Sequence, residues 1–119
     1  MYEIEFYQEA NGDTPIRILL EDLQAKGKTS KHDRVRSEKI LTYIRALEEL
    51  GPRLCEPFTK HLTDDIWELR PFNDRILFFY FKDNIYVLLH HFVKKTNKTP
   101  IKEIERAKKN KLTYIERSL

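Results

Sequence analysis

The sequence has few of the residues that cross-link small secreted proteins or dominate disordered ones. Cys55 is the only cysteine, so no internal disulfide can form, and a single thiol fits a reducing cytosol. Three Gly and five Pro are too few for a disordered or fibrous chain. No apolar run approaches the roughly 18 residues that cross a bilayer. The acidic, alternating start MYEIEFYQEANGD is unlike a signal or transit peptide, and we expect a cytoplasmic protein without a membrane segment.

The sequence also lacks the motifs of metal and nucleotide sites. Its four His and its acidic residues do not fall at the spacings of metal ligands. It has no glycine-rich loop that would hold phosphates through backbone N–H groups. We therefore expect neither a metal ion nor a cofactor.

The chain does contain enough apolar residues for one core. It has 119 residues, of which 40% are hydrophobic, with seven Phe, six Tyr and one Trp. This length is typical of a single domain, and we expect one domain over residues 1–119. The net charge of +3 is too small to prove nucleic-acid binding, but it is unevenly distributed. Residues 94–111 carry eight Lys or Arg against two Glu, so positive charge is concentrated there.

Hydrophobic periodicity and turn residues predict an α+β fold. The expected elements are a strand at 2–7, helices from 14 to 27 and from 30 to 50, strands at 66–70, 75–82 and 85–93, and a last helix from 99 onward. Residues 52–65 are expected to connect the second helix to the strands. The order is β-α-α-β-β-β-α, which corresponds to a small antiparallel sheet packed by helices.

The most informative stretch is WELRPFNDRILFFYFKDNIYVLLHHFVKKTNKTP, residues 67–100. Two apolar, strand-like runs within it end in clusters of Arg, Lys and His. The packing of a core strand does not require such ends. Cations gathered at strand ends indicate a site for an anion, and a nucleic-acid phosphate fits best.

Several motifs of this stretch resemble one family of toxins. They are IWELRP at 66–71, DRI at 74–76, LLHHFVKKT at 88–96 and KTP at 98–100, with Glu103 after them. Together with the element order they resemble the RelE/ParE toxin superfamily, and within it the HigB-like branch, also described as phage-derived Gp49-like proteins. The resemblance covers nearly the whole chain and implies a RelE-like fold.

The resemblance also implies the toxin of a type II toxin-antitoxin system. Such toxins are metal-independent endoribonucleases that typically cut messenger RNA in the ribosomal A site and so arrest translation. The implied partners are messenger RNA, the ribosome and a helix-turn-helix antitoxin (HigA-like), which alone would link the toxin to operator DNA. The ParE branch shares the fold but acts on DNA gyrase, so fold does not decide activity. A non-catalytic gyrase inhibitor and an inactive antitoxin-binding co-repressor stay open as alternatives.

Metal-free RNA cleavage needs a base for the attacking 2′-OH, cations for the phosphate and an acid for the leaving 5′-oxygen. Strand alternation places Trp67 and Leu69 on one face, which we expect in the core. Glu68 and Arg70 then face outward, where Arg70 can bind a phosphate or form a surface salt bridge. Arg75 starts the next strand and is also expected to bind phosphate. The two arginines would repel unless an anion or a carboxylate lies between them.

The residues at the end of the strand 85–93 are candidates for moving protons. His90 and His91 point to opposite faces, and alternation places His90 with Leu88. We select His90, which can act as acid or base near pH 7, although a lone strand histidine is often structural. Lys94 and Lys95 also diverge. One can approach the cleaved phosphate while the other contacts flanking RNA, unless both belong to a solvated strand end.

Further lysines and aromatic residues extend this surface. Lys98, Lys102 and Lys109 are expected to face RNA, or else to form a solvated helix face. Four aromatic side chains can stack on a base, namely Trp67, Phe72, Tyr80 and Tyr86, although aromatic residues in strands usually pack in the core. At Glu68 the chain departs from better-studied RelE relatives, which tend to carry a basic residue near this position. Their general base is therefore not carried over.

Overall fold

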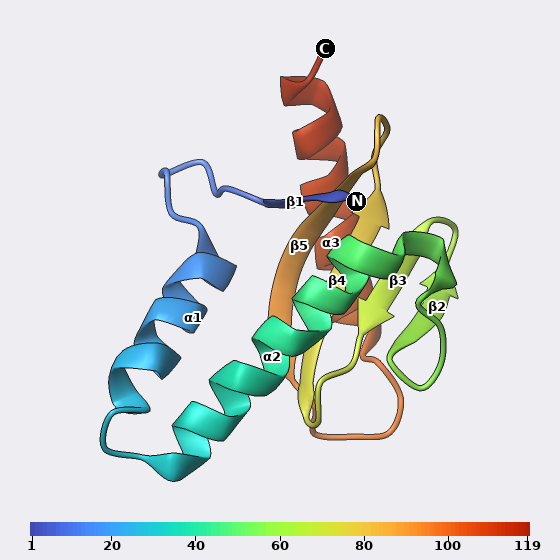
Figure 1. Cartoon of the computed structure of the whole chain (residues 1–119). Helices are drawn as coiled ribbons and strands as arrows, with labels where there is room; N and C mark the ends of the chain where they lie inside the picture. The colour runs from blue at the N-terminus through green and yellow to red at the C-terminus, as the bar shows by residue number, and fades with distance from the viewer.

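The computed structural model describes residues 1–119 and has an α+β architecture (Figure 1). Its elements in chain order are β1 (Glu3–Phe6), α1 (Pro15–Lys26), α2 (Lys31–Leu50), the 3-10 helix η1 (Gly51–Arg53), β2 (Thr59–Thr63), β3 (Ile66–Leu69), β4 (Asp74–Tyr80), β5 (Ile85–Val93) and α3 (Ile101–Arg117). Five strands form one sheet in the order β1-β5-β4-β3-β2. None of the helices is both long and apolar enough to cross a bilayer.

The sheet differs from the expected one in two ways. β2 forms within residues 52–65, where the sequence predicts only a connecting segment, and it pairs antiparallel with β3. This edge strand reads TKHLT, and its neighbouring Lys60 and His61 are both exposed, so it lacks an apolar–polar alternation. β1 runs parallel to β5, with Glu3 opposite Ile85, so the sheet is mixed rather than antiparallel. The order is therefore β-α-α-β-β-β-β-α.

The helices begin and end close to the predicted positions. The hydroxyl of Ser30 caps α2 by accepting a hydrogen bond from the N–H of Asp33 at 3.2 Å. α2 ends at Gly51, whose φ of +52° is in the left-handed region that favours glycine. Tyr2 packs so closely against Gly51 that a Cβ added there would lie 2.2 Å from its ring. The end of α2 is thereby fixed against the residues that lead into β1.

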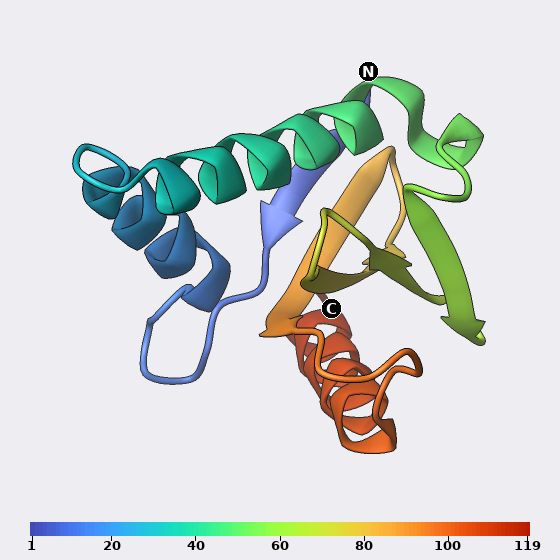
Figure 2. The ribbon, with the colours of Figure 1, turned by 90° about the horizontal axis from the view of Figure 1, so that it is seen from below.

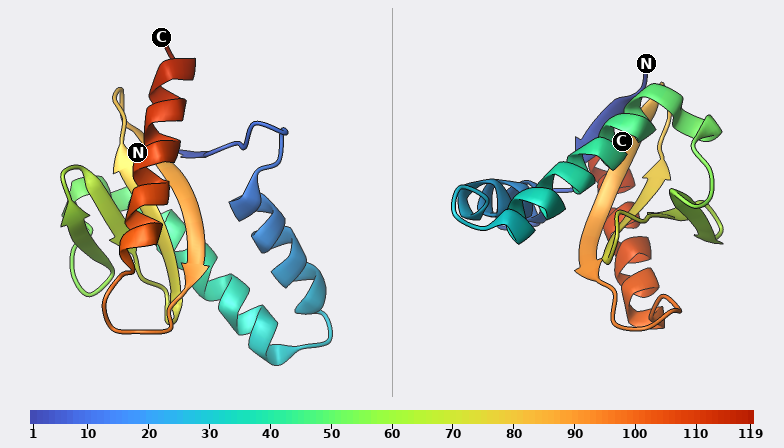
Figure 3. Two further views of the ribbon diagram at one scale, coloured as in Figure 1. Left: turned by 180° about the vertical axis from the view of Figure 1, so that it is seen from behind. Right: turned by 60° about the horizontal axis from the view of Figure 1, so that its bottom comes forward.

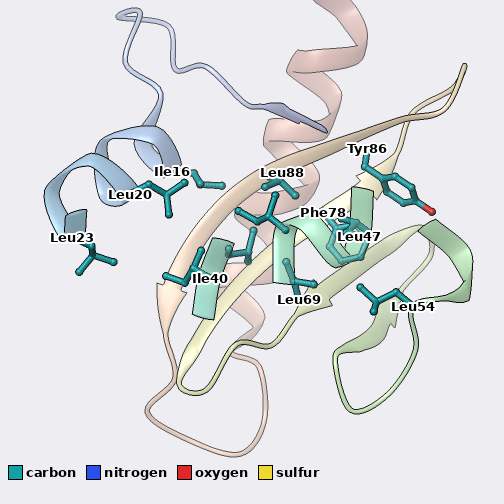
Figure 4. Packing of buried hydrophobic residues seen from close by; sticks show 12 residues of the cluster. Ile16, Leu20, Leu23, Ile40, Leu47, Leu54, Leu69, Phe78, Tyr86 and Leu88 are labelled. Atoms are coloured by element: carbon teal, nitrogen blue, oxygen red, sulfur yellow. The ribbon is translucent and has the colours of Figure 1, made fainter. Parts of the chain in front are cut away.

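Helices cover both faces of the sheet, and two apolar clusters result (Figure 2 and Figure 3). α1 and α2 pack on one face, where twelve buried residues form the larger cluster, with Ile40, Leu47 and Leu88 among them (Figure 4). α3 packs on the other face, where six buried residues form the smaller cluster, among them Leu77, Phe79 and Ala107 of α3 itself. Side chains on either face of the central strands are therefore enclosed, including polar ones.

A β-bulge in β5 changes the direction of its histidines. The register against β4 shifts between Leu88 and His90, so Leu89 is an extra residue on β5. Leu89 belongs to the cluster under α3, and His90 faces the same side, toward Glu103. The prediction that His90 shares a face with Leu88 is therefore wrong, because simple alternation does not count the bulge. His91 faces the opposite side from His90, as predicted, and contacts β4 on the α2 side.

Candidate active site

The end of β3, the start of β4 and the end of β5 lie side by side at one edge of the sheet. Arg70 directly follows β3, Arg75 is the second residue of β4, and Lys94 directly follows β5. β4 is antiparallel to both neighbours, with Arg75 opposite Phe92, so these residues lie at the same edge. The segment from β5 to α3 runs beside the β3–β4 turn (Figure 1). The cations that the sequence places at strand ends are thus brought together.

A cavity of about 280 Å³ lies between this edge and the start of α3; we call it the cationic cavity. Five of its lining residues are cationic, namely Arg75, Lys94, Lys95, Lys98 and Lys102. The four lysines form no salt bridge within the chain. Glu103 is the carboxylate in the lining. Such a concentration of free positive charge suits an anion of the size of a phosphate.

Glu68 lies buried between the two arginines, which corrects the expectation that it faces outward. Its side chain is only 1% exposed, since residues leading into α3 cover this face of β3. Its Oε1 lies 3.4 Å from Nε of Arg70 and 3.7 Å from Nε of Arg75. Its Oε2 accepts a hydrogen bond from the hydroxyl of Thr99 at 2.7 Å. The carboxylate therefore separates two arginines that would otherwise repel and ties them to the segment before α3.

The two arginines offer different groups to a phosphate. Arg75 lines the cationic cavity, and its Nη1 donates to the carbonyl oxygens of Phe72 at 2.7 Å and Asp74 at 2.9 Å. Burial lowers the pKa of the Arg75 guanidinium, and the charge of Arg70 lowers it further, yet an arginine stays protonated at neutral pH. Arg70 is a quarter exposed, contacts Glu68 and lies outside the cavity lining. The structure thus shows Arg70 in a salt bridge and Arg75 at the cavity.

His90 is buried next to Glu103 and lies outside the lining of the cationic cavity. Its side chain is 2% exposed, and its Nε2 is 3.3 Å from Oε1 of Glu103. This contact is not aligned as a hydrogen bond, and neither ring nitrogen has another partner. Burial lowers the pKa of His90 to about 4, and the charges of Arg106 and His91 contribute to the shift. His90 is therefore neutral at pH 7, and its access to the cavity is through Glu103.

A second charged cluster, on the α2 side of the same edge, has no counterpart in the sequence-based prediction. Asp74 accepts hydrogen bonds from Nε of Arg36 at 2.9 Å and Nη2 at 2.7 Å, and Nε2 of His91 lies 2.6 Å from its Oδ1. Burial alone would raise the pKa of Asp74, but these hydrogen bonds outweigh it and lower the pKa to about 2. Because Asp74 directly precedes Arg75, the cluster fixes the backbone at the start of β4. Arg36 gives no signal in the sequence, since the first turns of α2 are polar almost throughout.

The remaining candidate residues are spread over the molecule. Lys98 and Lys102 line the cationic cavity, whereas Lys109 lines only a different cavity, between α3 and the residues that follow β1. Trp67, expected in the core, is 38% exposed. It faces the α2 side, as alternation predicts, but β3 lies toward the edge of the sheet, where the helix gives little cover. No three His, Cys, Asp or Glu side chains are grouped as metal ligands would be.

Comparison with known protein families supports a relationship over most of the chain. The family model described as "Phage derived protein Gp49-like (DUF891)" matches residues 25–112. The match extends from the end of α1 into α3 and includes every residue of the cationic cavity. A search among curated proteins finds no match.

Proposed function

The chain belongs to the Gp49-like family of phage-derived proteins, a family of HigB/RelE-like toxins, and we propose that it acts as a ribosome-dependent endoribonuclease. In this function it is the toxin of a type II toxin-antitoxin system, cuts translated messenger RNA in the cytoplasm without a metal ion and arrests translation. The observation that carries the proposal is the cationic cavity, in which one oriented arginine and four unpaired lysines surround a space suited to a phosphate.

Unpaired lysines distinguish this cavity from an ordinary salt-bridge network. Where charge serves only stability, lysines are expected next to carboxylates, as Lys111 is next to Asp65 at 2.5 Å. Lys94, which is half-buried, and Lys95, which is exposed, have no such partner, although both line the cationic cavity. Placing like charges together without counter-charges costs free energy, and an RNA phosphate entering the cavity would offset that cost.

Charge neutralisation is the first part of the proposed chemistry. Arg75 and the lysine ammonium groups hold the scissile phosphate and stabilise the additional negative charge of the pentavalent transition state. Arg75 suits this role because two carbonyl oxygens fix its Nη1 and Glu68 lies beside its Nε, which leaves Nη2 for the ligand. Glu68 acts indirectly in this proposal, because its carboxylate contacts Arg75 from outside the cavity lining. Arg70 acts through Glu68, which it contacts in turn.

Proton transfer is the second part. Glu103 is the carboxylate of the lining, and we assign to it the removal of the proton from the 2′-OH. The 2′-oxygen then forms a bond to phosphorus while the bond from phosphorus to the 5′-oxygen breaks. The ammonium group of Lys94 or Lys95 donates a proton to the leaving 5′-oxygen, so that a cyclic phosphate and a 5′-OH result. Glu103, which is partly exposed, releases this proton to solvent after cleavage, and neutral His90, whose Nε2 lies 3.3 Å from its Oε1, positions that carboxylate from the buried side.

The partner in this proposal is a helix-turn-helix antitoxin of the HigA-like kind. It would silence the toxin by covering the cationic cavity or by pairing with an exposed edge of the sheet, such as β2. Contact of the toxin with operator DNA would then occur only through the antitoxin. Positive charge concentrated in one region of the toxin favours a partner that brings acidic side chains to it.

The proposal is tested by inducing the protein in cells with and without its antitoxin and mapping the 5′ ends of messenger RNA. We expect in-frame cuts confined to translated messages.

Lys94→Ala combined with Lys95→Ala should lower the cleavage rate by about 100-fold or more, the range known for loss of a transition-state contact. Arg75→Ala should abolish cleavage, and Arg75→Lys, which keeps a charge opposite Glu68, covers the case in which the alanine variant does not fold. Arg45→Ala, at an exposed arginine of α2, is the matched control and should cleave normally.

Two other outcomes would each replace the proposal. Growth arrest with intact messages and damaged DNA would identify an inhibitor of the gyrase type. The absence of arrest, together with antitoxin binding, would identify an inactive co-repressor.

A further inference from the structure

The β3–β4 turn contains a residue that neither the turn nor the core requires. Phe72 has a φ of +53°, in the left-handed region that favours glycine and asparagine. Its side chain is 59% exposed, so the strained backbone does not serve to bury the ring. The turn itself is closed by a hydrogen bond from the N–H of Asp74 to the carbonyl of Pro71 at 3.0 Å, which glycine at position 72 would allow equally well. A strained residue with an exposed aromatic ring suggests a function for that ring.

The ring of Phe72 is held in a fixed place beside the cationic cavity. The carbonyl oxygen of Phe72 accepts a hydrogen bond from Nη1 of Arg75 at 2.7 Å, so the two residues are directly connected. Nζ of Lys39 lies 4.5 Å from the centre of the ring and covers one of its faces. The side chain is more than half exposed and lines a further cavity, so part of the ring is accessible to a flat ligand.

A second cavity adjoins this open ring. It has a volume of about 730 Å³, and Phe72, Val35 and Val93 form its apolar part. The rest of its lining is polar or charged and consists of Lys31, His32, Asn73 and the paired Arg36 and Asp74. Val93 also lines the cationic cavity, so the two cavities meet at the end of β5. A ligand with an anionic part and a flat apolar part attached to it can occupy both. A nucleotide has this composition.

We propose that Phe72 stacks on a nucleobase of single-stranded RNA while Arg75 holds an adjacent phosphate. The inference rests on the proposed function and extends it, since it assigns the base-binding side of the site. Stacking on an aromatic ring accepts every base, because each base has a π-face. The site would therefore add affinity and position the backbone without reading a particular sequence.

The test measures stacking separately from cleavage. A short single-stranded RNA containing 2-aminopurine, whose fluorescence falls when the base stacks, is titrated with the full-length protein. We expect quenching by the wild type and binding about 5- to 100-fold weaker, without quenching, by Phe72→Gly. Phe72→Trp should restore binding. Tyr80 is also a candidate for stacking by sequence, but it lies at the opposite end of β4 and outside both cavities. Tyr80→Ala is therefore the matched control and should bind and quench as the wild type does.

The Phe72→Gly variant also separates function from structure. Glycine relieves the left-handed strain, so this variant should unfold at the same or a higher urea concentration than the wild type. Equal quenching by Phe72→Gly, or no quenching by the wild type, would overturn the inference. If only the antitoxin protects the ring from solvent, Phe72 belongs to a protein interface and the inference is likewise wrong. Messenger RNA cleavage is measured in parallel, and a wild type that stacks RNA but never cleaves it would contradict the proposed function alone.

Discussion

At the scale of single residues, Glu68 explains how two arginines can lie close together beside the cationic cavity. Removing a carboxylate from water is costly unless it is paired and hydrogen-bonded. Glu68 has both arginines within 3.7 Å and accepts a hydrogen bond from Thr99. Its charge is thus compensated inside the protein, and it orients Arg75 without occupying the cavity. The four lysines around the cavity form no salt bridge within the chain.

The neutral state of His90 leads to a prediction about pH. The unfolded histidine takes up a proton near pH 6.5, whereas burial lowers the pKa in the folded protein to about 4. Its contribution to stability is complete above pH 6.5 and is lost as the pH falls toward 4. The free energy of unfolding should therefore decrease by about 3 kcal/mol across this window because of His90 alone.

Urea denaturation of the wild type and of His90→Leu at pH 7, 5.5 and 4 measures this contribution. The leucine variant should lose about 3 kcal/mol less than the wild type between pH 7 and pH 4. His32→Leu, at a histidine whose side chain is 85% exposed, is the control and should follow the wild type. If His90→Leu and the wild type lose stability in parallel, the folded protein binds the proton at His90 as readily as the unfolded chain does.

At the scale of elements, the junction of α2 and η1 depends on Gly51. Gly12 and Gly51 both have a positive φ, at +93° and +52°. A Cβ at Gly12 would meet no atom within 4 Å, whereas at Gly51 it would lie 2.2 Å from the ring of Tyr2. Gly12→Ala should therefore show only the backbone cost, about 1 kcal/mol. Gly51→Ala should lose clearly more, about 3 kcal/mol, because Tyr2 must also move.

Chemical denaturation of both glycine variants separates the two costs. Tyr2→Ala combined with Gly51→Ala removes the clash and should cost less than the two single changes added together. Equal destabilisation by Gly12→Ala and Gly51→Ala would mean that the contact with Tyr2 does not restrain the end of α2.

Elements with a clear local signal were predictable from the sequence, whereas features that depend on pairing with another strand were not. Ser30 and Gly51 mark the ends of α2, and the apolar runs mark β4 and β5. β2 reads TKHLT and is a strand only because β3 lies beside it. The parallel direction of β1 is likewise a property of its pairing with β5. The alternation of β1 predicts a strand but not the direction of its pairing, and β2 has no periodic pattern of its own.

The candidate site shows the same division. Motifs in one strand or at its end identified Arg75, Lys94 and Lys95, which line the cationic cavity. The bulge at Leu89 reversed the expected direction of His90, since alternation assumes a regular register. Arg36 acts through Asp74, 38 positions further along the chain, and nothing near Arg36 indicates that contact.

At the scale of the whole molecule, positive charge is concentrated in one segment of the chain. Residues 94–111 carry eight Lys or Arg and two Glu, while the complete chain has a net charge of only +3. Folding places part of this segment around the cationic cavity. RNA would therefore approach one side of the protein, and the weakly acidic remainder would limit binding elsewhere.

Salt dependence measures how many phosphates this arrangement contacts. For single-stranded nucleic acid, the logarithm of the affinity falls with the logarithm of the salt concentration by about 0.7 per neutralised phosphate. Lys94→Ala combined with Lys95→Ala should thus reduce the slope by about 1 to 1.5. Binding of a single-stranded RNA measured between about 50 and 200 mM KCl gives this slope. Lys26→Ala combined with Lys28→Ala removes the same charge at the exposed end of α1 and should weaken binding little, with an unchanged slope. If both double variants reduce the slope equally, RNA responds to net charge alone, and the cationic cavity has no special part in binding it.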